Sequence, residues 1–163
     1  MNIPHTPIPA RRRALQWTAA SLAAVAAGPL WAQRAAPATA VEVWKDASCG
    51  CCQDWIAHMQ RNGFAVTAHD SGNNAVRARL GLAAKYGSCH TALVGGYVLE
   101  GHVHADEVRR LLREKPQALG LAVPGMPVGS PGMDGPEYKR RRDTYDTLLV
   151  LRDGSSRVFR SHA

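Results

Sequence analysis

Residues 41–63 read VEVWKDASCGCCQDWIAHMQRNG, and the periodicity of this stretch changes at its cysteines. Val41–Trp44 alternates side chains with a β-branched bias, which predicts a strand. The apolar residues that follow have helical spacing: Cys52, Trp55, Ile56 and Met59. Asn62-Gly63 then supplies a helix stop. The stretch therefore predicts a strand, a cysteine-bearing turn and a helix.

Strands and helices continue to alternate beyond residue 63. The predicted elements are a strand at Phe64–Ala68, a helix capped by Asn73 or Asn74 and ending near Gly81, a hairpin of Thr91–Val94 and Tyr97–Glu100 around Gly95-Gly96, and a helix that begins at His104 or Ala105 and is closed by Pro116. The resulting β-α-β-α-β-β-α order predicts an α/β fold with a thioredoxin-like mixed sheet over residues 41–115.

Residues 116–163 are expected to belong to the same domain. Leu119–Pro136 is rich in Gly and Pro and is predicted to be a loop. Thr147–Leu151 and Arg157–Phe159 flank Asp153-Gly154, a pattern that predicts a C-terminal β-hairpin.

The N-terminus has the pattern of an export signal. Arg11–Arg13 precede the uncharged segment Trp17–Leu30, and a cleavage site is expected before Gln33. Residues 1–32 are thus predicted to be a signal peptide, of the general secretory or the twin-arginine type, and residues 33–40 a linker. Periplasmic localisation follows, with no membrane insertion after the signal is removed, because the apolar segment is too short to span a bilayer.

The charge does not indicate a nucleic-acid partner. The 163 residues carry a formal charge of +7, which falls to +4 when the three signal arginines are removed. Part of the remainder is the run Lys139–Arg142, which lies in a predicted loop without interleaved aromatic residues. Such a run is typical of a solvated face, and we predict no nucleic-acid binding.

The four cysteines carry most of the functional information. Cys49, Cys51 and Cys52 lie at the predicted strand-to-helix turn, where free N–H groups favour thiolates. Cys89 immediately precedes the third predicted strand, and thioredoxin-like topology would bring it to the other three. The sequence therefore predicts four sulfurs in one pocket.

Three interpretations of these cysteines compete. Structural disulfides are compatible with export. A thiol-disulfide oxidoreductase would use the C-x-x-C pair Cys49 and Cys52, although two further thiols would divert exchange and no proline precedes the third strand. A metal site suits the crowded thiolates best, with Cu(I) favoured and zinc fitting less well, because Cu(I) is soft and thiolates can bridge several Cu(I) ions.

Several motifs together resemble the CopG-like periplasmic copper-resistance family. They are Val43-Trp44-Lys45, Cys49-Gly50-Cys51-Cys52, Ser88-Cys89-His90-Thr91, residues 96–103 (GYVLEGHV), residues 120–133 (GLAVPGMPVGSPGM), Tyr145-Asp146 and Val158-Phe159. The resemblance implies a thioredoxin-like fold and a copper cluster bridged by Cys49, Cys51, Cys52 and Cys89. Lys139–Arg142 differs from the family's usual segment.

Five other residues are secondary candidates. His90 adjoins Cys89 and is expected to be an extra ligand, a hydrogen-bonding neighbour of a ligand, or purely structural. His102 and His104 would point the same way in an extended stretch and form an auxiliary site, unless they are exposed residues at a helix start. Met126 and Met133 could form a lid or an acceptor arm for Cu(I), or simply pack.

The sequence thus predicts a periplasmic protein of copper tolerance that holds Cu(I), as a multinuclear cluster, on four thiolates. Its expected partners are copper ions and a copper exporter or periplasmic copper carrier. Redox activity of the copper or the thiols is compatible with the same residues, because the C-x-x-C pair can oxidise when copper leaves. The alternatives are a thiol-disulfide oxidoreductase and a docking module that presents the Gly/Pro loop to an exporter.

Overall fold

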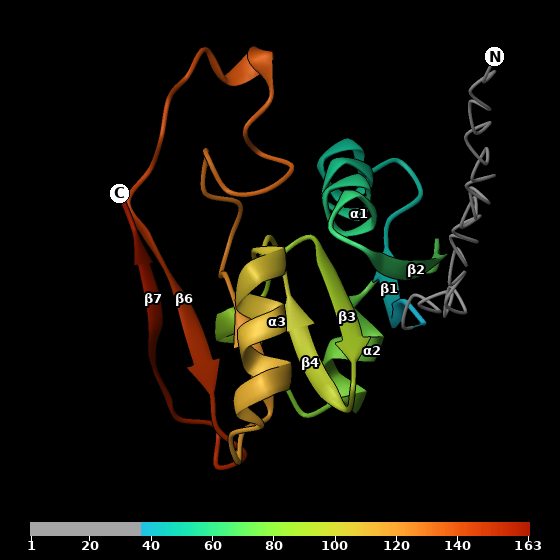
Figure 1. Ribbon diagram of the computed structural model, residues 1–163, viewed down its shortest axis with the longest axis vertical. Helices are drawn as coiled ribbons and strands as arrows, with labels where there is room; N and C mark the ends of the chain where they lie inside the picture. The colour runs from blue at the N-terminus through green and yellow to red at the C-terminus, as the bar shows by residue number, and fades with distance from the viewer. Residues whose placement is uncertain (1–36) are drawn as a thin grey trace, which may run out of the picture. The chain divides into compact units, whose positions relative to one another are not determined.

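The computed structural model describes residues 37–163, which form a mixed α/β structure around one seven-stranded sheet (Figure 1). The strand order is β2-β1-β3-β4-β5-β6-β7. The elements are β1 (Thr39–Lys45), α1 (Gly50–Arg61), β2 (Phe64–His69), α2 (Asn74–Arg79), the 3-10 helix η1 (Ala84–Tyr86), β3 (His90–Val94), β4 (Tyr97–Glu100), α3 (Ala105–Glu114), β5 (Gly120–Ala122), the 3-10 helix η2 (Pro136–Tyr138), β6 (Tyr145–Val150) and β7 (Ser156–His162).

The first half of the sheet has the predicted element order. β1 pairs with β2 in parallel and with β3 antiparallel, and β3 pairs with β4 through the Gly95-Gly96 turn. Both turn glycines have positive φ, 53° and 84°, as predicted for a two-residue hairpin. The signal peptide expected at residues 1–32 lies outside the described residues. β1 begins at Thr39, two residues earlier than predicted.

The second half of the sheet corrects one prediction. Leu119–Pro136 is not loop throughout, because Gly120–Ala122 forms β5 between β4 and β6, parallel to β4. All three residues of β5 are buried, so the sequence shows no alternation of apolar and polar residues there. The local pattern therefore did not predict a strand. Through β5, the predicted C-terminal hairpin, β6 and β7, joins the same sheet.

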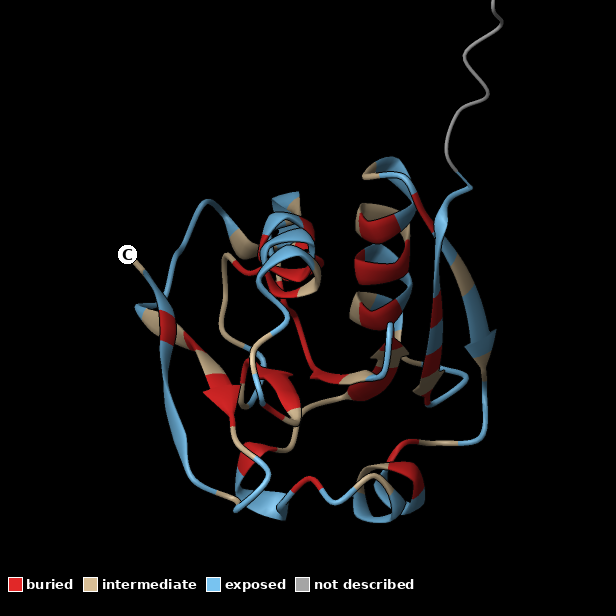
Figure 2. Ribbon diagram, turned by 60° about the horizontal axis from the view of Figure 1, so that its bottom comes forward, coloured by how far each residue is buried: buried red, intermediate tan, exposed pale blue. Residues whose placement is uncertain are grey.

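Helices cover both faces of the sheet (Figure 2). The larger apolar cluster contains the buried faces of α1 and α3, including Trp55, Met59, Val108 and Leu111. A smaller cluster on the side of α2 and η1 includes Leu82 and Tyr86. No helix among the described residues has the length and apolarity that crossing a membrane requires. The predicted apolar face of α1 is confirmed, and it fixes the orientation of the helix that begins with the cysteines.

The contact of Gly120 with β4 gives a test of the sheet. A Cβ at residue 120 would lie 1.7 Å from the Val98 carbonyl oxygen, so Gly120→Ala must separate β4 from β5. We expect it to lower the free energy of unfolding by about 3 kcal/mol. Gly154→Ala is the control: its φ is +82° with no atom near the added carbon, and about 1 kcal/mol is expected. If urea denaturation shows the same loss of unfolding free energy in Gly120→Ala and Gly154→Ala, the β4–β5 pairing is contradicted.

Candidate metal centre

The turn between β1 and α1 presents three cysteines at a helix start. Cys49 has extended backbone angles and is the N-cap of α1, and its N–H donates to the Asp46 carbonyl at 3.1 Å. The Asp46 carboxylate accepts hydrogen bonds from Ser48 N and Oγ, which tightens the turn. Cys51 and Cys52 follow in the first helical turn, where backbone N–H groups and the helix dipole favour negative charge on sulfur.

The pairing of β1 with β3 delivers the fourth cysteine. Lys45, the last residue of β1, lies opposite His90, the first residue of β3. Cys89 is therefore held next to the turn that carries Cys49, as the topology predicts. The Sγ atoms of Cys51 and Cys89 are 3.8 Å apart, although 38 residues separate them. All four Sγ atoms lie within 4.8 Å of one another.

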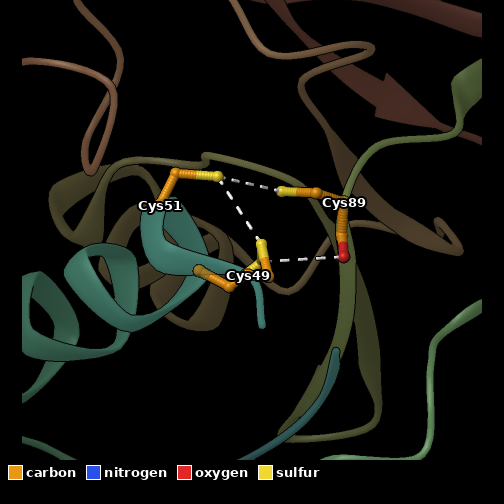
Figure 3. Close-up of side chains that lie close together, drawn as sticks. Cys49, Cys51 and Cys89 are labelled. Atoms are coloured by element: carbon orange, nitrogen blue, oxygen red, sulfur yellow. Dashed lines mark hydrogen bonds between the residues drawn. A yellow bond between two sulfur atoms is a disulfide. The ribbon is translucent and has the colours of Figure 1, made fainter. Parts of the chain in front are cut away.

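The four sulfurs are in two chemical states. Cys49 and Cys52 form a disulfide, while Cys51 and Cys89 are free thiols. Figure 3 shows the side chains of Cys49, Cys51 and Cys89 turned toward one another, with Cys51 Sγ 3.6 Å from Cys49 Sγ. Cys52 is fully buried and the other three are half-buried, so the pocket can be reached from solvent. In this state the C-x-x-C pair must be reduced before all four sulfurs can act as ligands.

Two buried histidines extend the sulfur pocket. His102 Nε2 lies 3.1 Å from Cys89 Sγ, and His90 Nδ1 lies 3.4 Å from the same sulfur. Burial raises the pKa of the Cys89 thiol to about 12, with a further contribution from Cys51. Burial lowers the pKa of both histidines. Two neutral histidine side chains thus face the protonated thiol of Cys89. The neutral form of histidine is the one that binds metal ions.

His102 is oriented by the Gly/Pro-rich segment. Its Nδ1 lies 2.8 Å from the Pro131 carbonyl oxygen, which can only accept, so Nδ1 carries the proton and the Nε2 lone pair faces Cys89. His90 Nε2, in contrast, is buried without a hydrogen-bond partner among the described residues. The expectation that His102 is an exposed helix-start residue is therefore wrong.

The segment around Pro131 closes over the first turn of α1. A Cβ on Gly132 would lie 2.6 Å from the Cys51 carbonyl oxygen and 2.8 Å from Trp55 N, so only glycine permits this approach. Met133 is almost fully buried, and its sulfur accepts a hydrogen bond from the Tyr138 hydroxyl at 3.3 Å. The structure thus places Met133 on the covering segment.

Two predicted residues lie apart from this arrangement. His104 does not share a site with His102, because its Nε2 pairs with the Tyr145 hydroxyl at 2.9 Å and its ring stacks on His162. The step from extended backbone into α3 sends the two side chains to different places. Met126 is 52% exposed, next to Gly125, whose N–H donates to the Gly87 carbonyl.

A buried polar network missed in the sequence holds the segment before Cys89. The Glu100 carboxylate accepts hydrogen bonds from Ser88 N, Thr91 Oγ1 and Arg77 Nε, at 2.6, 2.6 and 2.8 Å. Arg77 and Asn73 also donate to the Ser88 carbonyl oxygen. Side chains therefore fix both the N–H and the carbonyl group of Ser88. They come from β4 (Glu100), from α2 (Arg77) and from the residue before α2 (Asn73). A glutamate at a strand end carries no signal in sequence that it binds a distant backbone.

Comparisons with known proteins address the family. Two solved structures, named copper resistance protein copG, Form 1 and Form 2, are each 44% identical to this chain. Each match covers 77% of this chain and 98% and 99% of the other, with TM-scores of 0.71 and 0.72. The chain belongs to the CopG family. The family model described as a protein of unknown function, DUF411, matches residues 86–133, and the comparison with curated proteins gives no match.

The donor set of this CopG-family chain fits copper. Four sulfurs and two neutral imidazoles are soft to borderline ligands, which suit Cu(I) better than hard cations. Oxygen donors, which Mg²⁺ and Ca²⁺ require, are absent from both ligand groups found in the described residues. Family and geometry together support a copper-related role for the cysteine cluster.

Glu100→Gln tests the network behind Cys89. We expect it to destabilise the protein by about 3 kcal/mol, because it leaves Arg77 without its buried partner, and to speed alkylation of the free thiols as the Ser88 segment loosens. The control is Glu42→Gln, since the Glu42 side chain is exposed and its one ion pair within residues 37–163 is with His69 at 3.6 Å. Urea denaturation and thiol-modification rates measure both effects. Alkylation at the wild-type rate in Glu100→Gln would contradict the positioning role.

Proposed function

We propose that this chain is a periplasmic protein of copper tolerance that holds Cu(I), as a multinuclear cluster, on the thiolates of Cys49, Cys51, Cys52 and Cys89. The observation that carries the proposal is the convergence of all four sulfurs within 4.8 Å. The names of the two related structures, copper resistance protein copG, support copper as the cargo.

Charge and softness favour several Cu(I) ions over one zinc ion. A single Zn²⁺ with four thiolates leaves two uncompensated negative charges in a half-buried pocket, whereas equal numbers of Cu(I) and thiolate are neutral. Adjacent sulfurs, such as those of Cys49 and Cys51 at 3.6 Å, are spaced to share bridging ions. Bridging also relieves repulsion between thiolates.

Loading the full site requires reduction of the Cys49–Cys52 disulfide. A dithiol reductant supplies two electrons and two protons, the S–S bond breaks, and the reductant becomes a disulfide. Cu(I) then displaces the thiol protons. After copper leaves, a disulfide oxidant re-forms the Cys49–Cys52 bond by accepting two electrons and two protons and becoming a dithiol. The copper content of the site therefore depends on the oxidation state of Cys49 and Cys52, because the disulfide form leaves fewer sulfurs to bind copper.

Other predicted residues take supporting roles in this proposal. His102, with its Nε2 lone pair fixed toward Cys89, acts as a nitrogen ligand at the edge of the cluster, and His90 borders the same sulfur. Met133 belongs to the segment that closes over the first turn of α1, where its sulfur accepts a hydrogen bond from the Tyr138 hydroxyl. Met126, which is exposed on the loop held to residue 87, offers a thioether for passing copper to an exporter or a periplasmic carrier.

The remaining organisation follows from the same proposal. Residues 1–32 act as the signal peptide, of the secretory or twin-arginine type, and residues 33–40 link it to the core. The core, residues 41–115, is thioredoxin-like. The order β2-β1-β3-β4, with its parallel and antiparallel pairs, supports that assignment. Residues 116–163 complete the domain and supply the segment that covers the cysteines.

A thiol-disulfide oxidoreductase is the second candidate. The Cys49–Cys52 disulfide at a helix start favours it, with the free Cys51 thiol 3.6 Å from one of its sulfurs. A standing copper cluster would occupy these sulfurs and prevent exchange. Copper content and disulfide turnover therefore separate the two candidates.

Cu(I) titration of the anaerobically reduced protein tests the proposal. We expect more than one Cu(I) per chain, and fewer in Cys51→Ser and Cys89→Ser, because each loses a bridging sulfur. The matched control is wild-type protein kept in its disulfide form, which should bind less copper than the reduced form. At most one weakly held Cu(I), together with rapid turnover of a disulfide substrate, would favour the oxidoreductase.

His102→Gln tests the nitrogen ligand. We expect Cu(I) affinity to fall by about tenfold, measured by competition with a chromogenic chelator, because Gln lacks the imidazole lone pair facing Cys89. His104→Gln is the matched control, two residues away on the same segment but bonded to Tyr145. Equal affinities in the two variants would remove His102 from the site.

A further inference from the structure

The segment between β5 and β6 borders an open surface cavity that the copper site does not use. Figure 1 shows this segment in orange, passing from β5 beside α1 and returning to β6. The cavity has a volume of about 650 Å³. The residues that line it are Gly129, Asp134, Gly135, Pro136, Tyr138, Lys139, Arg140, Arg141 and Arg142. Its wall therefore carries four consecutive cationic side chains and one carboxylate.

These four cations have no ion-pair partner among residues 37–163. Other arginines of the chain do: Arg77 pairs with Glu100, Arg110 with Glu114 and Arg160 with Asp106. The one lining carboxylate, Asp134, accepts a hydrogen bond from Gly132 N, and the neighbouring Asp143 accepts one from Val128 N. Asp134 and Asp143 thus bond the backbone, and the Glu137 carboxylate, which lies close to Gly135, forms no ion pair with the four cations within residues 37–163.

The backbone is bent where the cations meet the cavity. Lys139 and Arg140 are consecutive residues in the left-handed region, with φ of 52° and 61°, a conformation that costs about 1 kcal/mol or more for each non-glycine residue. Arg142 packs against Gly129 on the opposite wall, where an added Cβ would lie 3.1 Å from its side chain. The bend keeps four adjacent cations around one space instead of spreading them along a strand.

The cavity adjoins the sulfur site through Tyr138. Tyr138 lines the cavity and donates its hydroxyl to Met133, the residue after Gly132, whose backbone abuts Cys51. The charge of Cys51 is also among the influences that raise the pKa of Tyr138, after burial and Glu137. A ligand in this cavity would lie beside the segment that covers the cysteines.

We propose that this cavity binds a small anion carrying several negative charges, of the polycarboxylate or phosphate class. Guanidinium groups recognise carboxylate and phosphate oxygens by paired hydrogen bonds, and a space of this volume accommodates a small molecule. The same four cations repel free copper ions. Copper therefore approaches this side of the protein as a chelate of net negative charge, a consequence that rests on the proposed copper function.

Calorimetric titration of the metal-free protein tests the anion site. Citrate and inorganic phosphate are the two probes, with acetate as the singly charged comparison. In Arg140→Gln/Arg141→Gln we expect citrate, phosphate or both to bind at least about tenfold more weakly than in wild type. The matched control, Arg113→Gln/Arg157→Gln, removes two exposed arginines outside the cavity and should bind as wild type does. Equal affinity in both double variants, or no binding of either probe at millimolar concentration, overturns the site.

The copper consequence has a separate readout. Uptake rates are compared for Cu(I) supplied as an anionic chelate, bicinchoninate, and as the cationic acetonitrile complex. Arg140→Gln/Arg141→Gln should slow uptake from the anion several-fold and leave uptake from the cation equal or faster, more so at low salt. Equal slowing from both sources overturns anion-guided delivery. Failure of the Cu(I) titration would refute the copper function but would leave the citrate result unaffected, because that measurement contains no copper.

Discussion

The antiparallel pairing of β1 with β3 is the constraint on which the site depends. It sets Lys45 opposite His90 and thereby brings Cys89 to a turn that lies about 40 residues earlier in the chain. A shift of this register by one residue would send the side chains of β3 to the other face of the sheet. The β1–β3 register positions Cys89, and the apolar face of α1, which packs through Trp55 and Met59, positions the other three cysteines at the start of that helix. Neither alone brings the four sulfurs together.

A polar layer protects that register where the core ends. Glu100 at the end of β4 binds the backbone of Ser88. Arg77 of α2 and Asn73, the residue before α2, bind the same backbone. Glu100 and Asn73 are buried and the Arg77 side chain is largely so, and each bond lost would therefore leave an unsatisfied charge or dipole. The network therefore gives the residue before Cys89 less freedom than loops normally have. A metal site benefits because sulfurs held in place lose little entropy when they bind.

What the sequence could predict depended on whether the signal was local. The helical spacing from Cys52 to Met59 and the Gly95-Gly96 turn are local patterns, and both were confirmed. The position of Cys89 followed from element order alone. β5, the burial of His102 and the role of Glu100 could not be predicted, because each depends on a partner distant in sequence: Val98, Pro131 and Ser88, respectively. The separation of His102 from His104 arises from the backbone change at the start of α3.

The negative charge of the cysteine cluster must be neutralised by something other than the cations of the segment between β5 and β6. Four thiolates without metal would place concentrated negative charge in a half-buried pocket, and burial already raises the pKa of Cys89 to about 12. Protons, a disulfide or Cu(I) can each neutralise that charge, and the described state uses the first two. The cations at Lys139–Arg142 lie beyond Tyr138, outside the sulfur set, so they compensate the thiolates only weakly through solvent. Because they are not consumed by the cysteines, they remain free to act on an anion that approaches from solvent.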